Sequence, residues 1–257
     1  MAEDWAGSPL TYCLLVLAGA VASAINSVAG GGSLVSFPTL VALGIPPLPA
    51  NATNAVALWP GSFAGAIGYR SEFAKTKGFL AALIAPTLIG AILGSWLLVV
   101  TDQSTFQHLI PFLVLGATIL LAFQPRVQQW ATKREGGRQK QWGIFLQFLV
   151  AVYGGYFGAG MGIMILAAMS LYVTGTLHEM NALKNWLGLL INLAAAVLLI
   201  TQGLVWLVPG LCLMAGAMIG GYAGARLSLR VSSERLRILI VAYGFSMSIW
   251  FFVRGFL

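Results

Sequence analysis

The sequence is poor in charged residues for its length. Only 8% of its 257 residues are Asp, Glu, Lys or Arg, whereas 59% are hydrophobic and the mean hydropathy is +0.88. No charged residue occurs in residues 5–69, 78–101, 141–178 or 185–225. A soluble domain of this size does not have such a composition. Each uncharged run exceeds the roughly 20 residues that one membrane-spanning helix needs, so we expect an integral membrane protein.

Residues that carry enzymatic or metal chemistry are equally scarce. The chain has seven acidic residues and two histidines, with no His-x-x-x-His motif, no paired carboxylates and no nucleophile beside a base. We therefore expect no enzymatic activity, no metal and no cofactor. Cys13 and Cys212 both fall in apolar runs, where a lone cysteine is usually a small packing residue rather than half of a disulfide.

What the sequence does contain is a pair of motifs that occurs twice. Ala29–Ser33 reads AGGGS and is followed by Asn51–Asn54, which reads NATN. A similar pair follows later, with AGMGI in Ala159–Ile163 and NALKN in Asn181–Asn185. Recurrence at one fixed spacing indicates an internal repeat.

The register of the repeat holds over much of the chain. Ala29 and Ala159 are 130 residues apart, and the pair Gly90 and Gly94 is matched at the same offset by Gly220 and Gly224. We interpret the chain as two related halves. The predicted division is a first membrane repeat in residues 1–125, a cytoplasmic linker in residues 126–141 and a second membrane repeat in residues 142–257.

The predicted elements are helices, because the apolar runs lack the alternation of transmembrane strands. Consecutive glycines cost a helix about 1 kcal/mol each relative to Ala, so residues 9–45 should form two shorter helices that meet at Gly30–Gly32. A second broken pair is expected in residues 142–174. The other predicted helices cover residues 51–69, 78–100, 105–123, 179–201, 204–229 and 236–253, with a polar loop over Arg70–Lys77.

Lys and Arg in the connections predict the orientation, since short loops rich in these residues stay in the cytoplasm. Arg70–Lys77 and Arg126–Lys140 should face inward, and Thr101–Ser104 outward. Counting both arms of the broken pair, each half has five crossings, and this odd number inverts the second half. The uncharged Thr201–Gly203, which is the counterpart of Arg70–Lys77, agrees with the inversion. Inverted repeats with equivalent broken helices are typical of secondary transporters.

Each half carries a stripe of polar or small residues on the helix after the break. The first stripe includes Asn51, Asn54 and Ser62, and the second includes Asn181, Lys184, Asn185, Gly188 and Asn192. Amide side chains are costly in lipid, so both stripes should face the protein interior. They could form a substrate site, or they could only bind neighbouring helices together.

The broken helices and Lys184 favour an anion as the ligand. Unpaired backbone N–H groups and the positive end of a helix dipole attract anions, and Lys184 would add a charge that suits an oxyanion. Alternatively, Lys184 lies at the cytoplasmic end of its helix and extends to water. Gly90, Gly94, Gly220 and Gly224 are expected to pack helices instead. The candidate substrate-binding residues are Gly30, Gly31, Gly32, Ser33, Asn51, Thr53, Asn54, Gly160, Gly162, Asn181, Lys184 and Asn185.

In these motifs the chain resembles the sulfite exporter TauE/SafE family, also called the toluene sulfonate uptake permease group. The resemblance covers nearly the whole chain, including the glycine-rich motif followed by Pro38 and the basic central loop. It implies a bacterial inner-membrane carrier of sulfur-containing oxyanions such as sulfite, sulfonates or sulfoacetate. The second motif departs from the first, with Ala168 at the position of Pro38 and Lys184 near that of Thr53. By matching position, Gly30, Gly31, Gly32, Asn51 and Asn54 take the family's first-motif role, and Gly160, Gly162, Asn181 and Asn185 the second.

The expected function is secondary transport of a small sulfur-containing oxyanion by alternating access, with the site at the repeat interface. A passive anion channel and a membrane enzyme or assembly factor are the alternatives. The expected partners are the anionic substrate and membrane lipids. No nucleic acid is expected, because no aromatic platform accompanies the basic central segment. A coupling ion, H+ or Na+, stays open, because no acidic residue lies deep in a predicted span.

Overall fold

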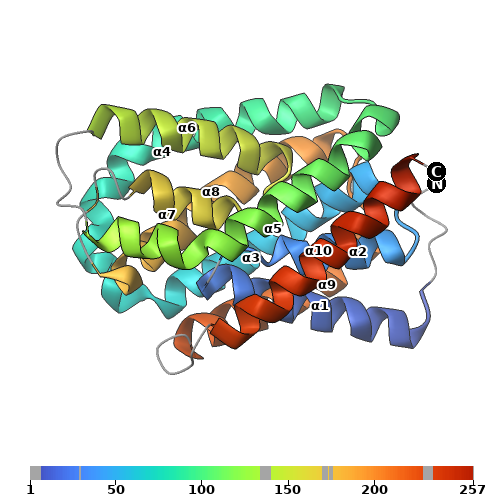
Figure 1. The fold of residues 1–257 in the computed structure, drawn as a ribbon, viewed down its shortest axis with the longest axis horizontal. Helices are drawn as coiled ribbons and strands as arrows, with labels where there is room; N and C mark the ends of the chain where they lie inside the picture. The colour runs from blue at the N-terminus through green and yellow to red at the C-terminus, as the bar shows by residue number, and fades with distance from the viewer. Residues whose placement is uncertain are drawn as a thin grey trace.

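The computed structural model describes residues 7–28, 30–133, 140–169, 173, 176–227 and 234–256. All regular structure in these ranges is α-helical (Figure 1), as predicted. The helices are α1 (Pro9–Val28), α2 (Ser33–Ala42), α3 (Pro47–Gly68), α4 (Arg70–Val100), α5 (Gln103–Lys133), α6 (Lys140–Tyr156), α7 (Met161–Met169), α8 (Leu177–Thr201), α9 (Leu207–Leu227) and α10 (Glu234–Phe256).

Six helical segments of the described chain are long and apolar enough to cross a membrane. They are α1, residues Lys77–Val100 of α4, Gln103–Arg126 of α5, α8, α9 and Arg237–Arg254 of α10. Helix α3 is not among them, since it contains Asn51, Thr53 and Asn54. Each of these three side chains is at most 2% exposed, so α3 places its polar groups in protein rather than in lipid.

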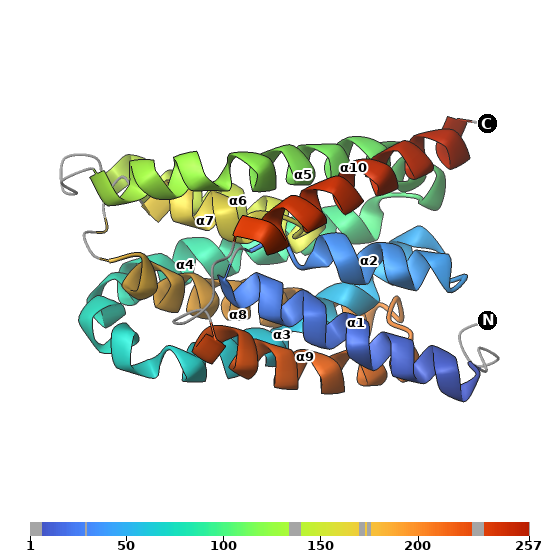
Figure 2. The ribbon, with the colours of Figure 1, turned by 60° about the horizontal axis from the view of Figure 1, so that its bottom comes forward.

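The helices lie side by side along the long axis of the molecule (Figures 1 and 2). Helix α1 packs along α9, and α6 packs along α4. Helix α3 contacts both α8 and α9, α8 contacts both α3 and α4, and α5 packs on α10. Helix α1 begins and α10 ends at the same end of the bundle (Figure 2). The centre of the bundle is therefore bounded mainly by α3, α8 and the two short helices α2 and α7.

The two predicted helix breaks are confirmed. Helix α1 ends at Val28 and α2 begins at Ser33, and Gly30 between them has φ +86°. Helix α6 ends at Tyr156 and α7 begins at Met161, after Gly158 and Gly160 with φ +79° and +76°. Backbone with positive φ favours glycine, which explains why both breaks lie in glycine-rich motifs.

The short arm of each broken pair turns back instead of crossing. Helices α2 and α7 have 10 and 9 residues, and at 1.5 Å per residue they are about 15 and 14 Å long, half of the membrane core of about 30 Å. Helix α2 points back to the end where α1 begins (Figure 2). Helices α2 and α7 are therefore too short to count as crossings of their own, and the broken pairs have the re-entrant form rather than the fully spanning one. Each pair therefore starts and ends at one end of the bundle.

Two predicted polar connections are helical instead. Arg70–Lys77, predicted as a loop, forms the first two turns of α4, and α5 continues past Phe123 to Lys133. Lys, Arg, Glu and Ala are good helix formers, and no proline follows Tyr69 until Pro86. Charged residues mark the membrane boundary here without ending the helix. Residues 134–139 of the predicted linker lie outside the described part of the chain.

The expected packing role of the paired glycines is confirmed. A Cβ atom on Gly90 would lie 2.5 Å from the Phe148 carbonyl oxygen of α6, and one on Gly94 would collide with the Val152 carbonyl. Gly220 and Gly224 stand against the backbone of α1 in the same way, at Ala20 and Ala24. Small residues thus bring α4 against α6 and α9 against α1.

The two cysteines are both free, and they differ in environment. Cys212 is half-buried, but Cys13 is exposed on α1, so the packing role expected for Cys13 is wrong. Aromatic side chains pack around α2. The Phe37 ring of α2 lies 5.4 Å from the Phe157 ring and 5.7 Å from the Phe251 ring, measured between centroids. These contacts fix α2 between the end of α6 and α10.

Candidate functional site

The tips of the two broken pairs meet in the middle of the protein. A Cβ atom on Gly30 would lie 2.6 Å from the Gly162 Cα, and one on Gly162 would lie 2.6 Å from the Gly30 Cα. Any side chain at either position would overlap the opposite backbone. The first and second glycine motifs, 130 residues apart in the sequence, are therefore in direct contact.

A cavity of about 20 Å³ lies beside this contact. It is lined by residues of α1, α3, α7, α8 and the first break, namely Asn26, Gly30, Ser62, Met161, Gly162, Ile165, Lys184, Asn185 and Gly188. No acidic residue is in this lining. A space of this size holds about one water molecule.

Lys184 is the charged residue of the cavity lining. Its side chain is 2% exposed, and its Nζ donates a hydrogen bond to the Ser27 carbonyl oxygen at 3.1 Å. The alternative that Lys184 extends to water is therefore wrong. An ammonium group has three N–H donors, and a buried charge is costly unless it is paired. A site with this cation and no lining carboxylate suits an anionic ligand.

Asn185 lies beside Lys184 in the same lining. Its Nδ2 donates to the Asn181 carbonyl at 2.8 Å and to the Ser27 carbonyl at 3.3 Å. Asn181 is 3% exposed and does not line the cavity, and its Oδ1 has no hydrogen-bond partner among the described residues. The second stripe thus faces the interior as predicted, with Lys184 and Asn185 at the cavity.

The first stripe is equally buried, but its hydrogen bonds go to protein groups. Asn51 Nδ2 donates to the Tyr156 carbonyl at 2.8 Å, and Asn54 Oδ1 accepts from the Ser36 hydroxyl at 2.5 Å. Thr53 Oγ1 accepts from the Trp206 backbone N–H at 2.9 Å. None of the three residues Asn51, Thr53 and Asn54 lines the cavity. Their part in substrate binding stays a prediction.

The remaining motif residues build the breaks around the cavity. The Gly32 N–H donates to Asn26 Oδ1 at 2.6 Å, and a Cβ on Gly31 would lie 3.2 Å from the Leu121 side chain. Ser33 starts α2 and is 7% exposed, and Gly160 provides a positive φ before α7. These four residues, Gly31, Gly32, Ser33 and Gly160, do not line the cavity.

Sequence reasoning missed Asn26, Met161 and Ile165 as lining residues and placed Ser62 and Gly188 on the stripes without assigning them to the site. Asn26 carried a usable signal, because it is an amide inside an apolar run, four residues before Gly30. Met161 and Ile165 carried none, since apolar residues are expected throughout such a chain. Within the described residues no group of three or more His, Cys, Asp or Glu side chains could hold a metal ion.

The comparisons with known proteins agree with this architecture. The model of the family "Sulfite exporter TauE/SafE" matches residues 15–251. A probable membrane transporter protein of Haemophilus influenzae is 27% identical over 236 residues, which cover 91% of this chain and 92% of the relative. The probable membrane transporter protein YfcA of Escherichia coli K12 is 26% identical over 245 residues, 94% of this chain and 89% of the relative. No solved structure matches the chain significantly. With six apolar helices and a family match over nearly its whole length, the chain belongs to the sulfite exporter TauE/SafE family and is a multi-pass bacterial membrane transporter.

Proposed function

We propose that the protein is a secondary carrier that moves a small sulfur-containing oxyanion by alternating access. The buried Lys184 ammonium, in a cavity without a lining carboxylate, is the observation that carries this proposal. One of its three donors is used by the Ser27 carbonyl, which leaves donors for an oxyanion. The first turn of α7, with Met161 and Gly162, adds the positive end of a helix dipole at the same cavity.

The sulfur class of the substrate is supported by the family, whose printed description is a sulfite exporter. Sulfite and sulfonates carry their charge over several oxygens. Such a group can accept from an ammonium, an amide and backbone N–H groups together. Lys184 and Gly162 in the first turn of α7 supply an ammonium and a backbone N–H group in the cavity lining, whereas Asn185 Nδ2 already donates to the Asn181 and Ser27 carbonyls.

We further propose that the two halves form inverted repeats around this cavity. In the repeat, α1, α3 and α4 correspond to α6, α8 and α9. The packing supports this, because α1 packs on α9 and its counterpart α6 packs on α4, and because α3 packs on α9 and its counterpart α8 packs on α4. The hydrogen bonds cross between the halves in the same manner. Asn51 of α3 donates to the last residue of α6, Tyr156, and Lys184 of α8 donates to Ser27 in the last turn of α1. Carriers with inverted repeats hold their substrate at such an interface.

The narrow centre of the protein fits the carrier proposal. The contact between Gly30 and Gly162 leaves no space for a pore at that point, and the adjoining cavity measures about 20 Å³. A sulfonate is several times the size of a water molecule. In the proposed mechanism the cavity therefore widens when the substrate binds.

Counterflow in proteoliposomes tests the carrier mechanism. Vesicles loaded with unlabelled sulfite or a small sulfonate should transiently accumulate the labelled anion, because a carrier exchanges one substrate molecule for another. Flux without stimulation by internal substrate would identify a channel instead. Absence of flux over a broad panel of anions would favour a membrane enzyme or assembly factor.

The proposed orientation can be tested by cysteine labelling in cells. In a Cys13→Ser, Cys212→Ser background, Gln202→Cys should react with a membrane-impermeant maleimide added outside, and Lys77→Cys should not. Gln202 and Lys77 are both exposed, and the segments that carry them lie at opposite ends of the bundle (Figure 2). The reverse pattern of labelling would show that the positive-inside rule has been misapplied to this chain.

A further inference from the structure

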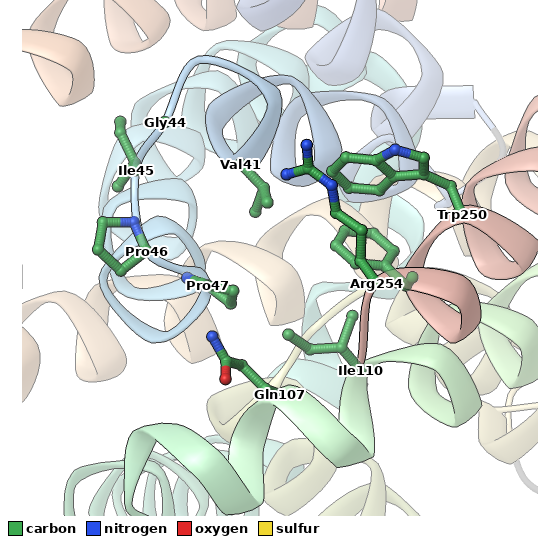
Figure 3. A pocket seen from close by; sticks show the side chains of 10 residues that line it. Val41, Gly44, Ile45, Pro46, Pro47, Gln107, Ile110, Trp250 and Arg254 are labelled. Atoms are coloured by element: carbon green, nitrogen blue, oxygen red, sulfur yellow. The ribbon is translucent and has the colours of Figure 1, made fainter. Parts of the chain in front are cut away.

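A second, larger cavity lies at the end of the bundle where α10 ends. Its volume is about 350 Å³. It is an open hollow lined by the turn between α2 and α3, the start of α5 and the end of α10 (Figure 3), and its Arg254 is exposed. It shares no lining residue with the central cavity, so the two are separate sites. Pockets for small ligands usually begin at about 300 Å³, which puts this one at the lower end of that range.

The polar side chains of this outer pocket are Arg254 and Gln107. They come from α10 and α5 respectively, and both extend into the hollow (Figure 3). The Arg254 guanidinium carbon lies 4.7 Å from the centroid of the Trp250 ring, which supports the guanidinium from one side. No acidic residue lines the pocket. A planar guanidinium presents paired N–H donors that fit a carboxylate or sulfonate group.

The rest of the pocket wall is apolar. It consists of Val41, Ile45, Pro46, Pro47, Ile110 and Phe251, together with the Trp250 ring. Inorganic anions such as sulfite or phosphate would leave this wall in contact with water. A ligand with a hydrocarbon body would cover it, and at about 25 cal/mol per Å² of buried apolar surface the wall would add to its affinity.

We propose that the outer pocket binds a small organic anion, with its oxyanion group on Arg254 and its hydrocarbon body against the apolar wall. Helix α2 joins this site to the centre of the protein. Val41 at the end of α2 lines the outer pocket, and Gly30, just before the start of α2, lines the central cavity. The proposal does not depend on the function proposed for the central cavity, because it rests on different residues.

Protection of a cysteine in the wall measures occupancy of this pocket alone. Val41 is half-buried and lines the pocket, so Val41→Cys in the Cys13→Ser, Cys212→Ser background can be modified by a maleimide in the purified protein. Benzenesulfonate and benzoate should slow the reaction in a saturable manner. Benzyl alcohol, which has the same ring without the charge, should not. Equal protection by benzyl alcohol would overturn the role of the anion.

The variant Arg254→Gln should raise the concentration for half-protection by about 10- to 150-fold, the cost of one lost charge-assisted hydrogen bond. Arg226→Gln is the matched control, because Arg226 also lies in a last helical turn, with its guanidinium 5.7 Å from its own aromatic ring, Tyr222, but does not line the pocket. Unchanged protection in Arg254→Gln would refute the proposal.

A Lys184→Met version of the same protein separates this site from the central one. Protection of Val41→Cys should persist in it, whatever happens to transport. Loss of protection in Lys184→Met would mean that the cysteine reports on the central cavity, and the outer site would be rejected. Loss of transport with protection intact would support two separate anion sites.

Discussion

Lys184→Met should lower the affinity of the purified protein for sulfite or a small sulfonate by about 10- to 150-fold, since a lost charge-assisted hydrogen bond costs about 1.5 to 3 kcal/mol. Lys184 is 2% exposed and belongs to a lining without a carboxylate, so no other side chain can replace its charge. Methionine is unbranched and of similar length, so the shape of the cavity is kept. Equilibrium binding and counterflow should both show the loss.

The thermal midpoint distinguishes a ligand-binding lysine from a structural one. Replacing a buried charge by an apolar side chain of similar volume is often neutral or stabilising, so the midpoint of Lys184→Met should not fall. Asn185 continues to donate to the Ser27 carbonyl in this variant. Lys77→Met, at an exposed position of α4, is the control for loss of one positive charge. Unchanged affinity with a lower midpoint would mean that Lys184 serves only to bind the end of α1.

Gly30→Ala should destabilise the protein by about 2 to 5 kcal/mol and abolish transport. The positive φ of +86° costs a residue with a side chain about 1 to 2 kcal/mol. The added methyl group would also lie 2.6 Å from the Gly162 Cα, and overpacking of this kind costs about 1 to 3 kcal/mol. Thermal unfolding followed by size-exclusion chromatography measures the first effect, and counterflow measures the second.

Gly162→Ala isolates the steric part of this effect, because Gly162 makes the same close contact without a positive φ. It should be less destabilising than Gly30→Ala. Gly116→Ala is the control, since a Cβ there meets nothing within 4 Å on an exposed face of α5. Wild-type stability and transport in Gly30→Ala would mean that the two broken pairs do not touch as described.

The positions of the breaks and stripes could be predicted because their causes are local. Three successive glycines interrupt a helix whatever surrounds them, and the spacing of Asn51 and Asn54 puts them on one face of any helix. The structure has both features. The start of α4 at Arg70 could not be predicted in the same way. Several of its first residues are charged, so their low hydropathy predicts a loop. These residues are nevertheless good helix formers, and they form the first turns of α4.

The composition of the two cavities could not be predicted from the sequence. The central cavity unites Asn26, Ser62 and Lys184, which are up to 158 residues apart and meet only through the packing of α1, α3 and α8. The outer pocket is lined by residues of α5, such as Gln107, and of α10, such as Arg254. Spacing along one helix carries no information about such partners. For the same reason Asn54, which the repeat makes equivalent to Asn185, turned out to bond to Ser36 and not to line the cavity.

The hydrogen bonds that connect the two halves at the end of α1 have a consequence for how the protein is made. The Ser27 carbonyl receives its donors from Lys184 and Asn185, which lie 157 and 158 residues further along the chain. Helix α1 leaves the ribosome long before α8 is translated. Until then the Ser27 carbonyl has to be hydrated or covered by the insertion machinery, because lipid offers no donor. The first half alone therefore lacks the two donors that the Ser27 carbonyl has in the whole protein.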